Sequence, residues 1–220
     1  MTTQRAHQRR RQWLTCWLTV AAAWLMALPS AQAQITYDPV TCGELTNAVG
    51  PFDVRTVAPH MLNLVETYHY FAEIQRLEGH RFAVGDNLDY TLRAIPNHPG
   101  ALRTISRFSV LVGKPQVPGA RRTVDCYFAR AIELAPDDPA PHMIYGVHLL
   151  KMNKVQGAVD ELKRATELGS QDPNIDYNLG LAYMELRQYE KAKEHAKRAY
   201  DRDYPLPGLR DKLTKAGQWP

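Results

Sequence analysis

Residues 173–206 read PNIDYNLGLAYMELRQYEKAKEHAKRAYDRDYPL, and they repeat the pattern of the 34 residues that precede them. Three small residues recur at that spacing of 34: Gly146 as Gly180, Ala158 as Ala192, and Ala165 as Ala199. A fixed period of roughly 20–50 residues is typical of solenoid proteins, in which each repeat packs mainly on its neighbours. This stretch therefore predicts an all-α array of stacked helix pairs.

The chemistry within one period agrees with two packed helices. Leu179, Gly180 and Tyr183 share one face of a first helix, and small residues allow close packing where a larger side chain would clash. Each period begins with an Asp-Pro pair, at Asp138 and at Asp172. Aspartate caps helices, and proline is tolerated in a first helical turn. We therefore expect one helix-turn-helix unit over 139–172 and another over 173–206.

These units resemble the tetratricopeptide repeat (TPR). The resemblance rests on the following residues in the two units: Asn178-Leu179-Gly180, Tyr183, Tyr189, Ala192 and Ala199, and, more loosely, Gly146, Leu149, Ala158, Leu162 and Ala165. It implies a TPR-type solenoid whose first helices line a concave groove. It also implies a noncatalytic role in binding partner proteins.

The array extends in both directions from these units. Residues 99–138 are expected to form a degenerate repeat with helices near 99–112 and 121–134, because 113–119 hold two glycines and two prolines and so form a loop. Residues 207–220 keep apolar side chains at helical spacing and predict the C-terminal capping helix that a solenoid needs.

Residues 34–98 lack the clear 34-residue pattern of the later units, and residues 34–60 are rich in glycine and proline. They predict an irregular N-terminal cap joined to a degenerate first repeat. We expect mostly loop over 34–60, with a short helix near 43–49, and helices within 60–78 and 87–95. The segments Cys42-Gly43, Gly50-Pro51-Phe52-Asp53 and Asp89-Tyr90-Thr91-Leu92-Arg93-Ala94 resemble a group of exported bacterial TPR proteins. That resemblance implies no reaction.

Residues 1–33 predict a cleaved signal peptide. An arginine-rich head precedes an apolar stretch of about 16 residues, and Ala31-Gln32-Ala33 supplies the small residues of a cleavage site before Gln34. An uncleaved anchor is the alternative, although a spanning helix needs about 20 residues. The protein is therefore expected to be periplasmic or secreted, without a stable membrane anchor after cleavage. The general and twin-arginine export routes both remain open.

The overall charge is misleading. The chain has 27 Lys and Arg residues against 23 Asp and Glu, but four arginines and no acid lie in residues 1–33. Removal of that segment leaves 23 basic and 23 acidic residues, and therefore no net charge. A mature chain without net charge is a poor binder of nucleic acid on electrostatic grounds, and we expect no nucleic-acid partner.

Two cysteines, Cys42 and Cys126, remain in the expected mature chain. A pair in an oxidising compartment favours a disulfide, which would tie the N-terminal cap to the first complete repeat. Two buried, inert thiols are the alternative.

The TPR resemblance places candidate binding residues in the concave groove. They are Met143, Val147 and Leu150 from one unit and Tyr177, Asn178, Leu181 and Met184 from the next. An open apolar groove would suit a peptide or helix of a partner, here an unidentified protein of the cell envelope. Alternatively, the protein's own N-terminal segment covers the groove as core.

No nucleophile–base pair, phosphate loop or metal-ligand spacing is found, so we expect no enzyme activity, no catalytic residue, no metal and no cofactor. The alternative is an accessory subunit of an envelope enzyme, or an enzyme whose unrecognised site uses the histidines of the cap. A self-associating structural protein is a third possibility. The arginines 103, 107, 121 and 122 are expected to form one basic cluster around the internal loop, most simply as a solvated face. A contact with an acidic partner or with a phosphate-rich polymer of the envelope is the alternative.

Overall fold

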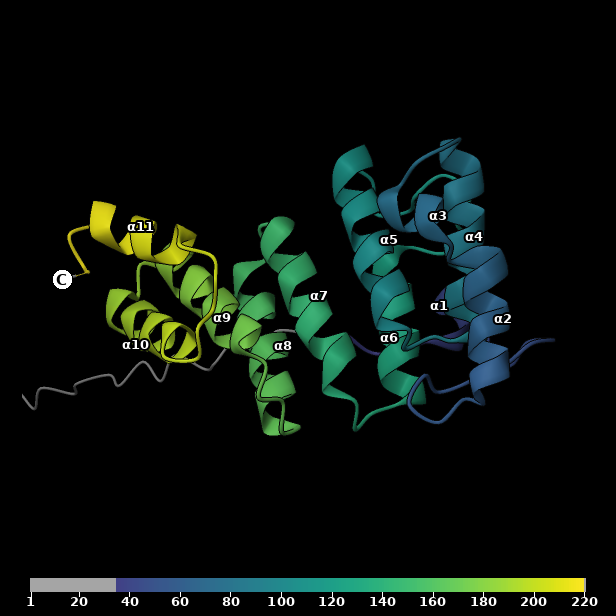
Figure 1. The fold of residues 1–220 in the computed structure, drawn as a ribbon, viewed down its shortest axis with the longest axis horizontal. Helices are drawn as coiled ribbons and strands as arrows, with labels where there is room; N and C mark the ends of the chain where they lie inside the picture. The colour runs from purple at the N-terminus through teal and green to yellow at the C-terminus, as the bar shows by residue number, and fades with distance from the viewer. Residues whose placement is uncertain (1–34, 220) are drawn as a thin grey trace, which may run out of the picture. The chain divides into compact units, whose positions relative to one another are not determined.

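The computed structural model describes residues 35–219. The predicted signal peptide over 1–33 and Gln34 of its cleavage site lie outside the described residues. Within 35–219 the chain forms helices and no strand, so the all-α prediction is confirmed (Figure 1). The helices are α1 Pro39–Cys42, α2 Pro59–His69, α3 Ala72–Arg76, α4 Arg81–Ala94, α5 Pro99–Val112, α6 Val124–Leu134, α7 Pro139–Lys151, α8 Val155–Glu167, α9 Pro173–Glu185, α10 Tyr189–Tyr200 and α11 Gly208–Lys215.

Helices α7–α10 form the TPR-type helix-turn-helix core that the period of 34 predicts. Helix α7 packs on α8, α9 packs on α10, and α8 and α9 join the two pairs (Figure 1). The side chain of Asp138 accepts a hydrogen bond from Ala140 N at 2.9 Å, and Asp172 accepts one from Asn174 N at 2.9 Å. These carboxylates satisfy N–H groups that lack a partner in the first turn of a helix.

The small residues of the repeat stand where helices approach closely. A Cβ at Gly146 would lie 2.6 Å from Leu162 Cγ, and a Cβ at Gly180 would collide with Leu209 Cδ2. Leu209 and Leu213 of α11 are fully buried against the preceding pair. Helix α11 therefore covers the end of the array, where a capping helix was expected.

A histidine–carboxylate pair ties the two helices of each core unit together. His142 Nδ1 lies 2.6 Å from Glu161 Oε2, and His195 Nδ1 lies 2.8 Å from Asp176 Oδ1. Because the positions recur at the spacing of 34, the two units use the same pair with the histidine and the acid exchanged between the helices.

The loop expected at 113–119 is present and extends to Thr123. It is held from within, because Ser109 Oγ donates to Lys114 O at 2.6 Å and Val124 N donates to Pro115 O at 2.8 Å. It also packs on α4, where a Cβ at Gly85 would collide with Pro118 O. The loop is therefore part of the packed structure.

The N-terminal cap differs from the prediction in its local detail. The prediction of a short helix near 43–49 is wrong. The helix in this region is α1, and it begins at Pro39 because the side chain of Asp38 accepts hydrogen bonds from Val40 N and Thr41 N. Residues 43–58 contain no helix and are held by their backbone; Phe52 N, for example, donates to Ala94 O at 2.8 Å. The helix expected over 87–95 begins earlier, at Arg81, as α4.

The region expected to be helical over 60–78 is divided into α2 and α3. Helix α2 ends at His69, and α3 ends before Leu77, which adopts a left-handed conformation (φ 61°). Within the described residues, no helix is long and apolar enough to cross a membrane.

Candidate functional site

Helices α5, α7 and α9 each begin at a proline, so their residues can be matched by counting from it. The fifth positions are Arg103, Met143 and Tyr177, and the ninth positions are Arg107, Val147 and Leu181. Helix α5 packs on α7, and α7 packs on α9 (Figure 1). We call the face that carries these positions the inner face.

The inner face holds a cavity of about 120 Å³ between α5, α7 and α9, which we call the inner cavity. Its lining residues are Arg103, Ser106, Arg107, Met143, Ile144, Val147, Lys151 and Asn174. Met143 and Ile144 are buried and Val147 is half-buried, and these three give the cavity an apolar floor.

Three cations stand around that floor. Arg103, Arg107 and Lys151 are exposed, and within residues 35–219 none of them forms an ion pair. Arg107 Nη1 lies 3.4 Å from Gln75 O, a long contact to a backbone carbonyl. The inner cavity thus combines apolar surface with positive charge that the described protein does not neutralise.

A buried polar pair supports the wall of the cavity. Ser106 Oγ lies 3.0 Å from His148 Nδ1, and both residues are buried. Burial lowers the pKa of His148, because the charged imidazolium is poorly solvated there. His148 is therefore neutral near pH 7 and adds no charge to the site.

The structure brings only Met143 and Val147 of the seven predicted groove residues into the inner cavity. Tyr177 is buried, with its ring centroid 4.4 Å from that of Tyr204. Asn178 is also buried, and its Nδ2 donates to Asn174 O at 2.8 Å. The remaining three, Leu150, Leu181 and Met184, are half-buried.

The chain's own C-terminal segment covers part of the inner face of α9. Tyr204 Oη donates to Asn174 Oδ1 at 3.1 Å, and a Cβ at Gly208 would lie 3.0 Å from Tyr177 Oη. Lys212 of α11 pairs with Glu185 at 2.9 Å. By contrast, no described residue of the N-terminal segment lines the inner cavity.

The single basic cluster expected around the internal loop does not form. Arg121 and Arg122 approach Asp89 at 3.6 Å each, whereas Arg103 and Arg107 line the inner cavity. The sequence therefore did not indicate that Arg103 and Arg107 lie on the inner face. Counting from Pro99 in register with Pro139 and Pro173 would have found them.

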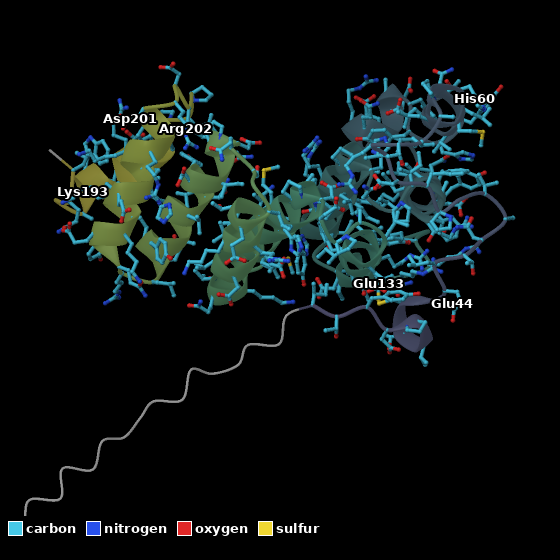
Figure 2. All side chains as sticks on the ribbon, turned by 90° about the horizontal axis from the view of Figure 1, so that it is seen from below. Glu44, His60, Glu133, Lys193, Asp201 and Arg202 are labelled. Carbon is cyan, nitrogen blue, oxygen red and sulfur yellow. A yellow bond between two sulfur atoms is a disulfide. The ribbon has the colours of Figure 1, made fainter. Side chains whose placement is uncertain are left out.

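The N-terminal cap is joined to α6 by covalent and polar contacts. Cys42 and Cys126 form the predicted disulfide, with their Cα atoms 5.1 Å apart. Arg130 Nη1 donates to Gly43 O and to Glu44 O, each at 2.7 Å. Helix α1 contacts α6, and Figure 2 labels Glu44, which follows α1, and Glu133 of α6.

A buried carboxylate lies behind the same junction. Asp89 is fully buried on α4, and Arg93 Nε donates to its Oδ2 at 2.8 Å. Tyr127 Oη donates to Oδ1 of the same carboxylate. Burial, reinforced by this carboxylate, raises the pKa of Tyr127 and keeps it protonated.

The cap histidines are not gathered into one site. His60, labelled in Figure 2, and His80 are exposed, and His69 stacks on Tyr90 with centroids 3.7 Å apart. His98 Nδ1 accepts from Ala101 N at 3.1 Å, so its Nε2 is the protonated nitrogen that donates to Glu66 at 3.0 Å. In residues 35–219, no three His, Cys, Asp or Glu side chains could hold a metal ion together.

A larger hollow of about 400 Å³ lies between α8, α9 and α10. Its central carboxylate, Asp176, lies 2.8 Å from His195 and 2.9 Å from Arg198, with Arg202 at 3.5 Å. These charges are already paired within the protein. This hollow therefore offers a ligand less unsatisfied charge than the inner cavity does.

Comparison with known proteins gives no family. No family model matches the chain, and no curated protein matches it. Among solved structures, the crystal structure of MamA is similar at 22% identity and a TM-score of 0.42, over 60% of this chain and 82% of that chain. A similarity of this size assigns neither a family nor a function to the chain.

Proposed function

We propose that this chain is a noncatalytic interaction or scaffold protein of the bacterial cell envelope, which binds a peptide or helix of a partner protein on its inner face. One observation carries the proposal: equivalent positions of α5 and α7 meet at a cavity with an apolar floor and three cations that form no ion pair within residues 35–219. Exposed apolar surface rimmed by polar groups marks interaction sites on proteins.

The size of the inner cavity favours a protein ligand over a small molecule. At about 120 Å³ it is well below the roughly 300–1,000 Å³ of pockets that bind small molecules. A cavity of this size takes one side chain. Anchor side chains that fill such pockets supply much of the affinity of protein interfaces.

The placement in the cell envelope is supported by the cysteines and by the expected signal peptide. Disulfides such as Cys42–Cys126 persist in oxidising compartments and are rare in the cytosol. The TPR-type fold provides the frame for an interaction surface, whereas the role argued here comes from the inner cavity.

We expect a photo-reactive amino acid at position 147 to crosslink a specific protein in cells that make the exported chain. Val147 is half-buried in the inner cavity, so a bound segment must pass within reach of it. The matched control is the same probe at Lys163, an exposed position of α8 that does not line the inner cavity. The measurement is the mass and identity of the adducts at each position.

An adduct at position 147 that is absent at position 163 supports the proposal. Equal adducts at the two positions, or adducts at position 163 alone, contradict binding on the inner face. Circular dichroism of both purified variants, with unchanged thermal unfolding, excludes misfolding as the cause.

A further inference from the structure

The charges of the inner cavity are of one sign. Its eight lining residues include three cations and no acid. Two carboxylates outside this lining already have partners: Glu66 accepts a hydrogen bond from His98 at 3.0 Å, and Glu185 pairs with Lys212 at 2.9 Å. Arg103, Arg107 and Lys151 are exposed and form no ion pair within residues 35–219, so a ligand in the cavity meets their positive charge.

A ligand that covers this surface must compensate the cations. A neutral apolar segment would remove water from Arg103 and Arg107 without giving them a partner, which is unfavourable. A carboxylate can accept two hydrogen bonds from the planar guanidinium group of an arginine. These charge-assisted bonds are stronger than hydrogen bonds between neutral groups. The same charges also speed the encounter with an acidic ligand.

The floor of the cavity argues against a ligand that is only anionic. Met143, Ile144 and Val147 present apolar surface between the cations. Burial of such surface stabilises a complex only when apolar groups of the ligand cover it. A polyanion without apolar side chains would leave these three apolar side chains in contact with water.

We propose that the partner segment is acidic, with one apolar side chain inserted between Met143 and Val147 and flanking carboxylates on Arg103, Arg107 and Lys151. This inference rests on the proposed function and adds the chemistry of the partner. It places the acidic part of the segment over α5 and the C-terminal end of α7. The chain's own C-terminal segment already covers the neighbouring surface of α9 at Tyr177.

The test is a selection of random short peptides on the purified mature protein, so no partner sequence has to be known. Peptides selected on the wild type are expected to be enriched in Asp and Glu next to an apolar residue, relative to the input library. Each is expected to bind Arg103→Glu/Arg107→Glu at least about tenfold more weakly, because two exposed charge pairs become repulsive. Higher salt is expected to weaken binding to the wild type.

A matched control reverses two charges elsewhere. Lys163→Glu/Lys197→Glu makes the same change in net charge on α8 and α10, at exposed lysines that form no ion pair within the described residues. Binding of the selected peptides to this variant is expected to stay within about twofold of wild type. Poly-glutamate serves as the probe for an anionic polymer.

Three results would overturn the inference. In the first, the selected peptides are no more acidic than the input library but no longer bind the Val147→Asp variant. This result would mean that the inner face binds a ligand without acidic character. Poly-glutamate that binds the wild type as tightly as the best peptide would point to an anionic polymer. In the third, no peptide is enriched and no adduct forms at position 147. This result would contradict the proposed function itself.

Discussion

Replacement of Asp89 by alanine is expected to lower the free energy of unfolding by about 3–5 kcal/mol. Asp89 is fully buried and accepts hydrogen bonds from Arg93 at 2.8 Å and from Tyr127. Its carboxylate also faces Arg121 and Arg122, each at 3.6 Å. Its removal leaves positive charge inside the protein without a counter-charge.

The same junction already contains unsatisfied donors, which makes the loss more costly. Within the described residues, Arg122 Nη1 and both Nε and Nη2 of Arg130 are buried without a hydrogen-bond partner. Burial, reinforced by Arg122, lowers the pKa of Arg130, which reports the unfavourable surroundings of its charge. The carboxylate of Asp89 lies 3.6 Å from Arg122 and also pairs with Arg93 and Arg121.

The measurement is urea unfolding followed by circular dichroism, with Asp86→Ala as the matched control. Asp86 lies three residues earlier on α4 and is exposed, so its loss is expected to change stability by less than about 0.5 kcal/mol. If Asp89→Ala does not fold, Asp89→Asn keeps the shape and removes only the charge. A free energy of unfolding for Asp89→Asn equal to that of wild type would contradict this account of the junction.

Loss of the Cys42–Cys126 disulfide is expected to lower the free energy of unfolding by up to about 4–5 kcal/mol. The bond closes a loop of 84 residues, and an open loop of that length gives the unfolded chain many more conformations. The folded protein keeps part of the junction, since Arg130 still donates to the carbonyl groups of Gly43 and Glu44. We therefore expect a destabilised protein that still folds.

Urea unfolding of the mature protein with and without dithiothreitol measures this loss, and Cys42→Ser/Cys126→Ser is its independent control. The reduced wild type and the double variant should unfold at the same, lower urea concentration. Thiol titration of the denatured, unreduced protein should find no free thiol. Two free thiols, or one midpoint under both redox conditions, would show that the bond does not act as described.

The sequence predicts the fold best where local signals agree with one another. For α7–α10 the Asp-Pro starts, the close-packing glycines and the period of 34 all indicate the same helices, and all four form. Helix α5 is also predicted to the residue, because Pro99 begins it and Gly113 ends it in a left-handed conformation (φ 66°). The division of the chain into repeats remains a prediction beyond these helices.

The N-terminal cap was predicted poorly because long-range contacts fix it. Nothing local to residues 43–58 shows that Asn47 donates to Arg93 O at 2.8 Å or that Val54 N donates to Asn97 at 2.9 Å. The sequence pattern predicts the short helix after Cys42, whereas the helix ends at Cys42 because the capping side chain is that of Asp38. Composition indicated a loop-rich segment, but not its partners.

The candidate site was partly predicted for a similar reason. Repeat register predicts that Met143 and Val147 share the inner face, and both line the inner cavity. The cover of Tyr177 by Tyr204 depends on how the chain returns after α10, which no repeat pattern encodes. Arg103 and Arg107 are predicted to lie in the basic cluster at the internal loop and not on the inner face, because the insertion at 113–123 obscures their register with the later repeats.

The central claim is that the partner binds at the inner cavity, and the methionines provide the most direct test. The expected mature chain has methionines at 61, 143, 152 and 184, and only Met143 lines the inner cavity. In the mature protein labelled with ¹³C at the methionine methyl groups, we expect titration with the selected acidic peptide to shift the Met143 resonance. The resonance of Met61, on α2, should stay in place. A shift at Met61 with none at Met143, at saturating peptide, would contradict the claim and move the binding surface to the N-terminal cap.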